Sequence, residues 1–110
     1  MSVEQTETVD FITVDKSSGD ICLTISDHLP WDSDEGTHLL MLQNKLNSYL
    51  RFIESGEMIE QYPKAKGRRA VINLVGKFPL SDEASRFFNL AREQIERTGY
   101  RLQFSLLRPN

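Results

Sequence analysis

The sequence predicts a two-layer α/β sandwich in the order ββαβαβ, with a mostly parallel four-stranded sheet and two helices on one face. Three observations support this fold class: short runs of alternating apolar residues, two stretches with apolar residues at helical spacing, and a strand–loop–helix segment that occurs twice. A chain of 110 residues can bury a core without a disulfide or a metal. Residues 1–8 are polar and are expected to form a disordered tail, which leaves a single domain over residues 9–110.

The first two predicted strands form an antiparallel hairpin. Residues 9–14 make the first strand, and residues 21–26 alternate apolar with polar side chains in the second. Residues 15–20 between them are turn-forming, and Gly19 can adopt the left-handed conformation that closes a short hairpin. Residues 71–75 predict a third strand, and alternating apolar residues at 102, 104 and 106 predict the last.

Two amphipathic helices complete the predicted order. Residues 33–55 carry an apolar stripe at helical spacing, and Gly56 follows where a C-terminal cap belongs. The second helix opens at Ser81 and ends at Thr98 and Gly99. Its predicted buried face consists of Ala84, Phe87, Phe88, Ala91 and Ile95.

An internal repeat supports the same topology. Residues 21–31 followed, after one residue, by Ser33-Asp34-Glu35 align with residues 70–80 followed directly by Ser81-Asp82-Glu83. In each copy a serine can accept hydrogen bonds from the first free amides of a helix, and two acids meet the positive end of the helix dipole. Asp34 and Glu35 therefore have a structural role at a helix start. Two right-handed crossovers of this kind place both helices on one face of the sheet.

The opposite face of the sheet is predicted to be uncovered. Its polar and β-branched side chains suit a homodimer or a protein partner, and a solvated face is the alternative. The interface candidates are Thr24, Val71, Asn73, Val75 and Gln103.

The stretch from Ser26 to His38 holds both histidines and the only tryptophan of the chain. Loops that leave the carboxyl ends of neighbouring parallel strands lie side by side, which is where α/β folds bind ligands. A cleft for an anionic ligand is therefore predicted between Asp27, His28 and Trp31 on one loop and Lys77 on the next. The alternatives are that His28 and Lys77 are solvated loop residues and that Trp31 covers the core.

A metal site could use His28 and His38 with Asp32 or Asp34, because Asp34 and His38 lie one helical turn apart. The alternative is that His38 is a helix-surface residue bonded to Asp34. The sequence contains one Glu-x-x-His pair, no Gly-x-Ser-x-Gly motif and no phosphate-binding loop, so no cofactor is predicted.

Charge and composition restrict the classes of partner that the sequence predicts. Thirteen basic and sixteen acidic residues give a net charge of −3, which argues against a nucleic acid as partner, and Lys64, Lys66, Arg68 and Arg69 are predicted to form a charged loop. The single cysteine excludes an internal disulfide. The sequence has no membrane-spanning apolar run and no signal peptide, so a cytoplasmic location is expected.

Several segments together resemble a family of small bacterial proteins known only as a domain of unknown function. They are residues 9–10, 25–29 and 31, the helix 38–56, and the pairs Tyr62-Pro63 and Phe78-Pro79. The resemblance covers most of residues 9–105 and implies a bacterial, cytoplasmic protein. It implies no activity, cofactor or catalytic residue.

The leading functional hypothesis is a non-enzymatic protein-interaction module with an accessory, regulatory or toxin-neutralising role, because an acidic domain without a catalytic constellation fits binding better than turnover. The alternative is a small-ligand or metal-dependent enzyme that uses the Asp27, His28 and His38 region.

Overall fold

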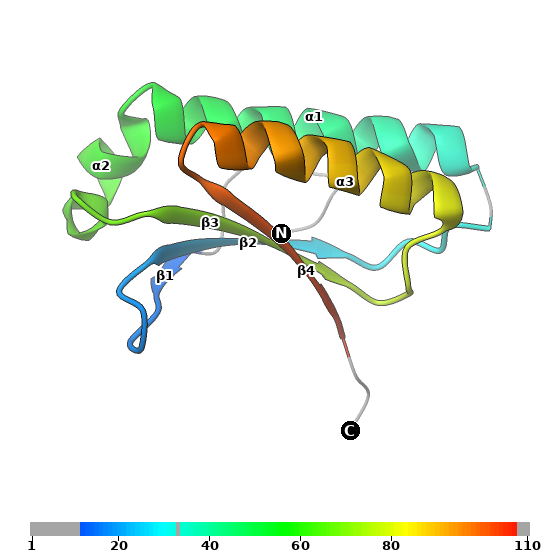
Figure 1. The fold of residues 1–110 in the computed structure, drawn as a ribbon, viewed down its shortest axis with the longest axis horizontal. Helices are drawn as coiled ribbons and strands as arrows, with labels where there is room; N and C mark the ends of the chain where they lie inside the picture. Colours follow the sequence, from blue (N-terminus) through cyan, green and yellow to red (C-terminus); the bar gives the residue numbers. More distant parts are fainter. Residues whose placement is uncertain (1–11, 33, 108–110) are drawn as a thin grey trace.

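The computed structural model describes residues 12–32 and 34–107 and shows a four-stranded sheet with helices on one face (Figure 1). The predicted tail at residues 1–8, the beginning of the first predicted strand at residues 9–11, and Ser33 as a helix cap lie outside the described residues. No helix within the described ranges is long and apolar enough to span a membrane.

The sheet is mixed, not mostly parallel as predicted. Its strands, β1 (Ile12–Val14), β2 (Ile21–Asp27), β3 (Ala70–Gly76) and β4 (Arg101–Leu106), lie in the order β1-β2-β3-β4. β1 pairs antiparallel with β2, whereas β2 with β3 and β3 with β4 pair in parallel. A short hairpin reverses the chain between β1 and β2, while helical crossovers keep the later strands parallel.

The hairpin turn forms as predicted. Gly19 has a φ of 79°, a backbone conformation that favours glycine. The Asp15 carboxylate accepts hydrogen bonds from the hydroxyl of Ser17 at 2.7 Å and from its amide at 2.8 Å. These bonds favour the charged form and lower the pKa of Asp15.

Within residues 12–32 and 34–107, three α-helices accompany the sheet, one more than the sequence predicts. α1 (Glu35–Glu54) and α3 (Asp82–Arg97) confirm the two predicted helices and lie over the same face of the sheet (Figure 1). The unpredicted helix α2 (Glu57–Gln61) follows α1 directly and leads into a 3₁₀ turn, η1 (Pro63–Ala65). Gly56 ends α1 with a φ of 88°, which lets the chain turn and bury Met58. The interruption at Ser55 and Gly56 makes α2 a separate helix.

The core lies between the sheet and the helices. The apolar residues of β2 alternate with polar ones, so Ile21, Leu23 and Ile25 all face the core and are at most 2% exposed. The hydroxyl of Tyr49 on α1 donates to the carbonyl oxygen of Thr24 at 3.0 Å and joins the two layers. Trp31 is also buried in this core, as the alternative interpretation predicted. Further core residues come from both long helices: Leu42, Leu46, Phe52, Ile53, Ala84, Phe88 and Ile95.

The glycine at the end of β3 generates a prediction. A Cβ on Gly76 would lie 2.8 Å from Cε1 of Phe104 and 3.2 Å from the carbonyl oxygen of Phe78, whereas a Cβ on Gly36 of α1 meets nothing within 4 Å. We expect Gly76→Ala to lower the free energy of unfolding by about 2 kcal/mol through overpacking. Gly36→Ala, the matched control, should raise it by up to about 1 kcal/mol because alanine favours the helix. Urea unfolding measures both, and equal effects would contradict the packing described here.

Candidate functional site

The carboxyl end of β2 holds a buried carboxylate that is hydrogen-bonded on both oxygens. Asp27, the last residue of β2, is 4% exposed and points toward the helices. Its Oδ1 accepts a hydrogen bond from the amide of Leu29 at 3.1 Å, and its Oδ2 lies 2.5 Å from Nε2 of His38. The backbone oxygen of Asp27 accepts from the amide of Lys77 at 2.8 Å. Asp27 therefore connects β2, the loop after β3 and α1.

His38 lies in the first turns of α1 and is enclosed on all sides. Its Nδ1 is 3.2 Å from the carbonyl oxygen of Pro30, and its ring stacks on Trp31 with 3.5 Å between the ring centroids and 13° between the planes. The side chains of His38 and Asp27 are each 3% exposed. The loop from β2 to α1 thus folds back over its own histidine.

The imidazole of His38 is hydrogen-bonded through both of its ring nitrogens. A carbonyl oxygen only accepts, so Nδ1 of His38 carries a hydrogen that it donates to Pro30. Nε2 lies 2.5 Å from Oδ2 of Asp27, so the second ring nitrogen is hydrogen-bonded as well. This pairing reduces the cost of burying two ionisable groups. Both ring nitrogens are occupied, so neither has a lone pair available for a metal or a substrate.

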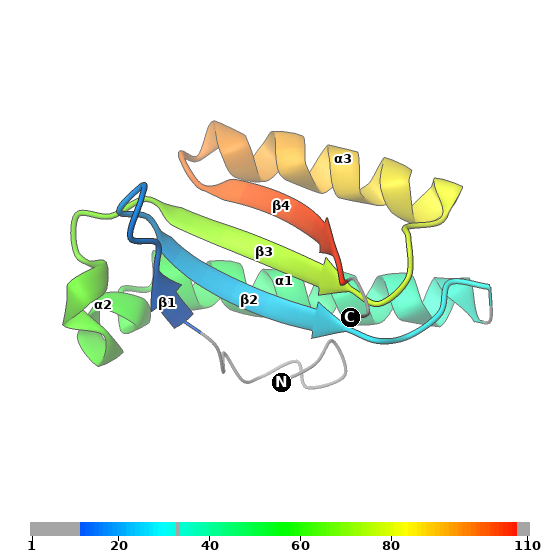
Figure 2. The same cartoon turned by 90° about the horizontal axis from the view of Figure 1, so that it is seen from below.

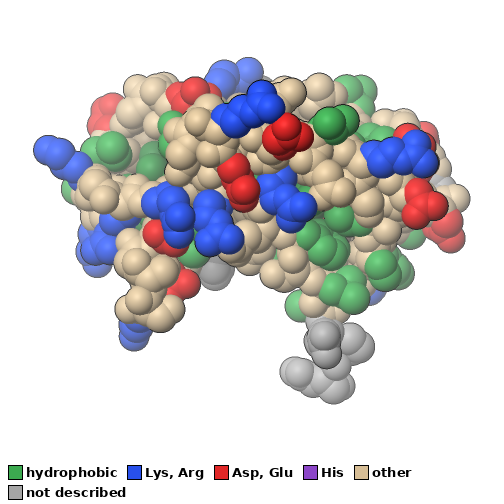
Figure 3. Space-filling view, viewed as in Figure 1, with side chains coloured by type: hydrophobic (Ala, Val, Ile, Leu, Met, Phe, Trp, Pro, Cys, Tyr) green, Lys and Arg blue, Asp and Glu red, His purple; other side chains and the backbone are tan. Residues whose placement is uncertain are grey.

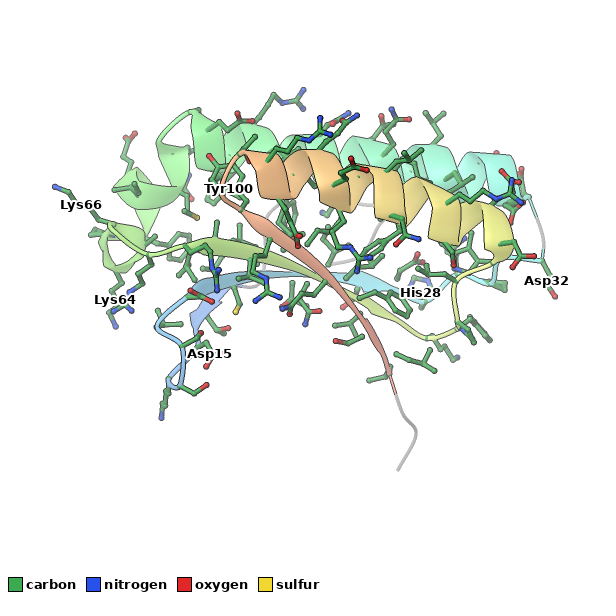
Figure 4. All side chains as sticks on the ribbon, viewed as in Figure 1. Asp15, His28, Asp32, Lys64, Lys66 and Tyr100 are labelled. Carbon is green, nitrogen blue, oxygen red and sulfur yellow. The ribbon has the colours of Figure 1, made fainter. Side chains whose placement is uncertain are left out.

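The predicted cleft residues divide into a buried and an exposed pair. Asp27 and Trp31 come together around His38 inside the protein, whereas His28 and Lys77 are exposed. The two loops are neighbours, as predicted, through the bond from Lys77 to Asp27. Figure 4 shows His28 just beyond the end of β2 and Asp32 at the outer tip of the loop. The ligand cleft itself remains a prediction.

The predicted link between His38 and Asp34 is wrong for their side chains. Asp34 is exposed, and only its backbone oxygen accepts from the amide of His38, at 3.1 Å. The imidazole turns inward instead, because the loop brings a carboxylate and a carbonyl to its two nitrogens. Among the residues that the structure describes, no group of three or more His, Cys, Asp or Glu side chains is placed to hold a metal.

The starts of the two long helices are joined by a hydrogen bond that the sequence did not reveal. Ser81 caps α3 as predicted, accepting from the amide of Ala84 at 3.1 Å. Its hydroxyl also donates to Oε2 of Glu35 in the first turn of α1. Asp34 caps α1 with a φ of 51° and without a side-chain cap bond. Glu35 therefore has the structural role that the repeat predicted, with an added partner.

The predicted charged loop is partly tied to the first hairpin. Arg68 donates to the carbonyl oxygens of Lys64 and Gly19, each at 2.8 Å. Arg69 pairs with Asp20 at 3.0 Å, and this hydrogen bond lowers the pKa of Asp20. Lys64 and Lys66 project outward at this end of the molecule (Figure 4). Half of the basic cluster thus holds the loop against the hairpin.

The sheet face opposite the helices carries the predicted interface residues. Register places Thr24, Asn73 and Gln103 in one row across β2, β3 and β4. Val71 and Val75 lie in the flanking rows, and Ser105 donates to Oδ1 of Asn73 at 3.3 Å. Figure 2 looks onto this face, with α1 behind the sheet and α3 alongside β4. The described helices leave it uncovered.

A groove of about 450 Å³ lies on the other side of the molecule, between α1 and α3. It is lined by apolar residues with polar groups among them, namely Gln43, Leu46, Asn47, Leu50, Glu54, Phe87, Leu90, Ala91, Gln94, Ile95 and Thr98. The candidate residues around Asp27 do not line this groove.

The comparisons with known proteins identify a family but no function. A family model described as "Family of unknown function (DUF6572)" matches residues 1–108. No curated protein and no solved structure matches the chain. The bacterial origin that the resemblance implied stays a prediction.

The buried pair predicts a large stability difference between two aspartates. We expect Asp27→Ala to lower the free energy of unfolding by about 3 kcal/mol, because it leaves the buried His38 without its partner. Asp32→Ala, at an exposed position in the same loop, should change it by less than about 0.5 kcal/mol. Urea unfolding of both variants measures this difference. A loss at Asp27 no larger than that at Asp32 would contradict a structural role for the pair.

The free cysteine predicts slow alkylation. Burial raises the pKa of the Cys22 thiol, and the negative charges of Asp15 and Asp20 raise it further. The reactive thiolate is therefore scarcer than in a free thiol at pH 8, and iodoacetamide should react at least about threefold more slowly with Cys22 than with glutathione. Asp15→Asn should increase the rate and shift its pH dependence to lower pH. A rate equal to that of glutathione would refute this interpretation.

Proposed function

Because the chain belongs to DUF6572, a family of unknown function, we propose from its own residues that it is a non-enzymatic protein-interaction module that forms a homodimer through the uncovered sheet face. The observation that carries this proposal is the near absence of charge on that face. Charged residues make up 26% of the chain. Of the strand residues described on this face, only Arg101, at the start of β4, is charged; the others are Thr13, Cys22, Thr24, Ser26, Val71, Asn73, Val75, Gln103 and Ser105.

A neutral face is where two copies of an acidic protein can approach each other. Each copy has a net charge of −3, so two copies repel each other weakly in most relative orientations. Residues close to a two-fold axis through the middle of the sheet lie near their own copies, so a charge there would face a like charge. The row of Thr24, Asn73 and Gln103 has none. Its side chains can exchange hydrogen bonds with a second copy, and the half-buried Val75 beside the row supplies apolar area, whereas Val71 is only 4% exposed.

The burial of the chemically active side chains also supports binding over turnover. Asp27 and His38, which the enzyme hypothesis needs in an open site, are hydrogen-bonded to each other beneath Trp31. Opening this pair for a substrate would expose a junction that holds β2 to α1. The geometry of the described residues therefore favours the interaction hypothesis.

Sedimentation equilibrium tests the proposal. We expect the wild-type protein to be a dimer at micromolar concentration. Asn73→Lys places an ammonium group on the central strand β3, where it meets its copy, and should weaken the dimer at least about tenfold. Asn44→Lys makes the same substitution on an exposed position of α1 and should leave the dimer intact. A wild-type monomer at these concentrations, or equal effects of the two variants, would refute dimerisation through this face.

A further inference from the structure

We propose that the outer edge of β4 is a second binding site, which takes an extended acidic segment of a partner protein as a fifth strand. The site consists of the outward peptide groups of β4, whereas self-association is assigned to the side chains of the sheet face, and Arg101 borders both. β4 is the last strand of the sheet and pairs only with β3 in the described structure. An exposed edge of this kind offers its peptide groups to another strand.

The peptide groups that β4 offers can be assigned. The amide of Leu107 donates to the carbonyl oxygen of Gly76 at 2.7 Å, so the peptide groups of Gln103 and Ser105, at even spacing from Leu107, also face β3. Those of Leu102, Phe104 and Leu106 consequently point outward. Only an extended backbone can bond to three alternate peptide groups in a row, which identifies the occupant as a strand.

This edge lacks the usual protection against strand pairing. Edge strands are commonly blocked by bulges, prolines or several charges. β4 keeps a regular register with β3 from Arg101 to Leu106, contains no proline and carries one charge, at its first residue. A six-residue edge without these devices is suited to pairing.

Helix α3 runs alongside the outer edge of β4. Figure 2 shows α3 running along β4 on its outer side, so an added strand would lie beneath the helix. Phe88 of α3 contacts Phe104 of β4 edge to face at 6.2 Å between centroids, and the guanidinium of Arg92 lies 5.6 Å from the centre of the Phe88 ring. The side chains of an added strand that point toward α3 would therefore meet Arg92.

Charge at the first half of β4 selects an acidic partner. Arg86 and Arg97 of α3 form ion pairs with Glu83 and Glu93. Arg92 instead bonds to the amide oxygen of Asn89, and neither Arg92 nor Arg101 has an ion pair among the described residues. One arginine lies on each face of the incoming strand, so two consecutive acidic residues, whose side chains point to opposite faces, would complement both.

The second half of β4 is apolar. Phe78, Leu106 and Leu107 are 37%, 44% and 57% exposed, and the bond from Leu107 to Gly76 brings them together at the ends of β3 and β4. Figure 3 shows hydrophobic side chains gathered at the lower right, and basic side chains interspersed with acidic ones over the helices. An antiparallel partner strand would therefore run from apolar residues to acidic ones.

The test uses a synthetic peptide and amide NMR. The probe is an acetylated and amidated octapeptide that alternates valine and threonine and ends in two glutamates; its control ends in two lysines. We expect saturable shifts that are larger for the amides of Leu102, Phe104 and Leu106 than for those of Gln103 and Ser105. Arg101→Glu should weaken binding of the acidic peptide at least about tenfold at low salt and improve binding of the basic one.

A proline variant separates edge pairing from surface adhesion. Leu106→Pro removes an outward amide while leaving the bonds to β3, so binding should be lost although the melting temperature stays close to that of Leu106→Ala. Leu106→Ala keeps the amide and should still bind. The proposal is overturned if the acidic peptide gives no saturable shifts up to about 1 mM, if the shifts map to the groove between α1 and α3, or if both Leu106 variants bind equally. Leu106 alternates with Gln103 and Ser105 along β4 and so projects from the opposite side of the sheet to Asn73, which makes the proline test independent of whether the protein dimerises.

Discussion

The buried hydrogen bond between Asp27 and His38 is the interaction on which the arrangement of the two layers depends. It joins the end of β2 to the first turns of α1, while the Asp27 carbonyl holds the loop that follows β3. Each polar group at this junction has lost its water and needs a protein partner, so the junction tolerates little displacement. The bond between Ser81 and Glu35 adds a second tie at the same end, between the starts of α1 and α3. Together they determine where both helices begin on the sheet.

This use of the most reactive side chains has a functional consequence. A carboxylate, an imidazole and an indole that could form an active site are packed against one another, whereas the described sheet face opposite the helices and the edge of β4 carry mainly neutral side chains and backbone peptide groups. Such groups recognise proteins through area, shape and strand pairing better than they activate a small molecule. The sheet face and the β4 edge meet along one strand, so the two surfaces proposed for binding adjoin each other.

Charge distribution reinforces this division of the surface. The chain is acidic overall, yet several arginines have assigned roles within the fold: Arg68 and Arg69 hold the loop before β3 against the hairpin. Arg92 and Arg101 remain at the β4 edge without ion pairs in the described residues. These two arginines would attract an acidic partner to this edge, because the net negative charge of the protein repels acidic partners from the rest of its surface.

Local patterns in the sequence determined the strands, the two long helices, the left-handed turn at Gly19 and the serine cap at Ser81. Periods of two and 3.6 residues and cap bonds depend on residues only a few positions apart. The tertiary structure alone decided that His38 pairs with Asp27, 11 positions away, instead of with Asp34 one turn away, and that Ser81 bonds to Glu35 across 46 positions. It also decided that Gly56 separates a third helix. Such contacts depend on how segments pack, and several partners compete for each polar group until burial selects one.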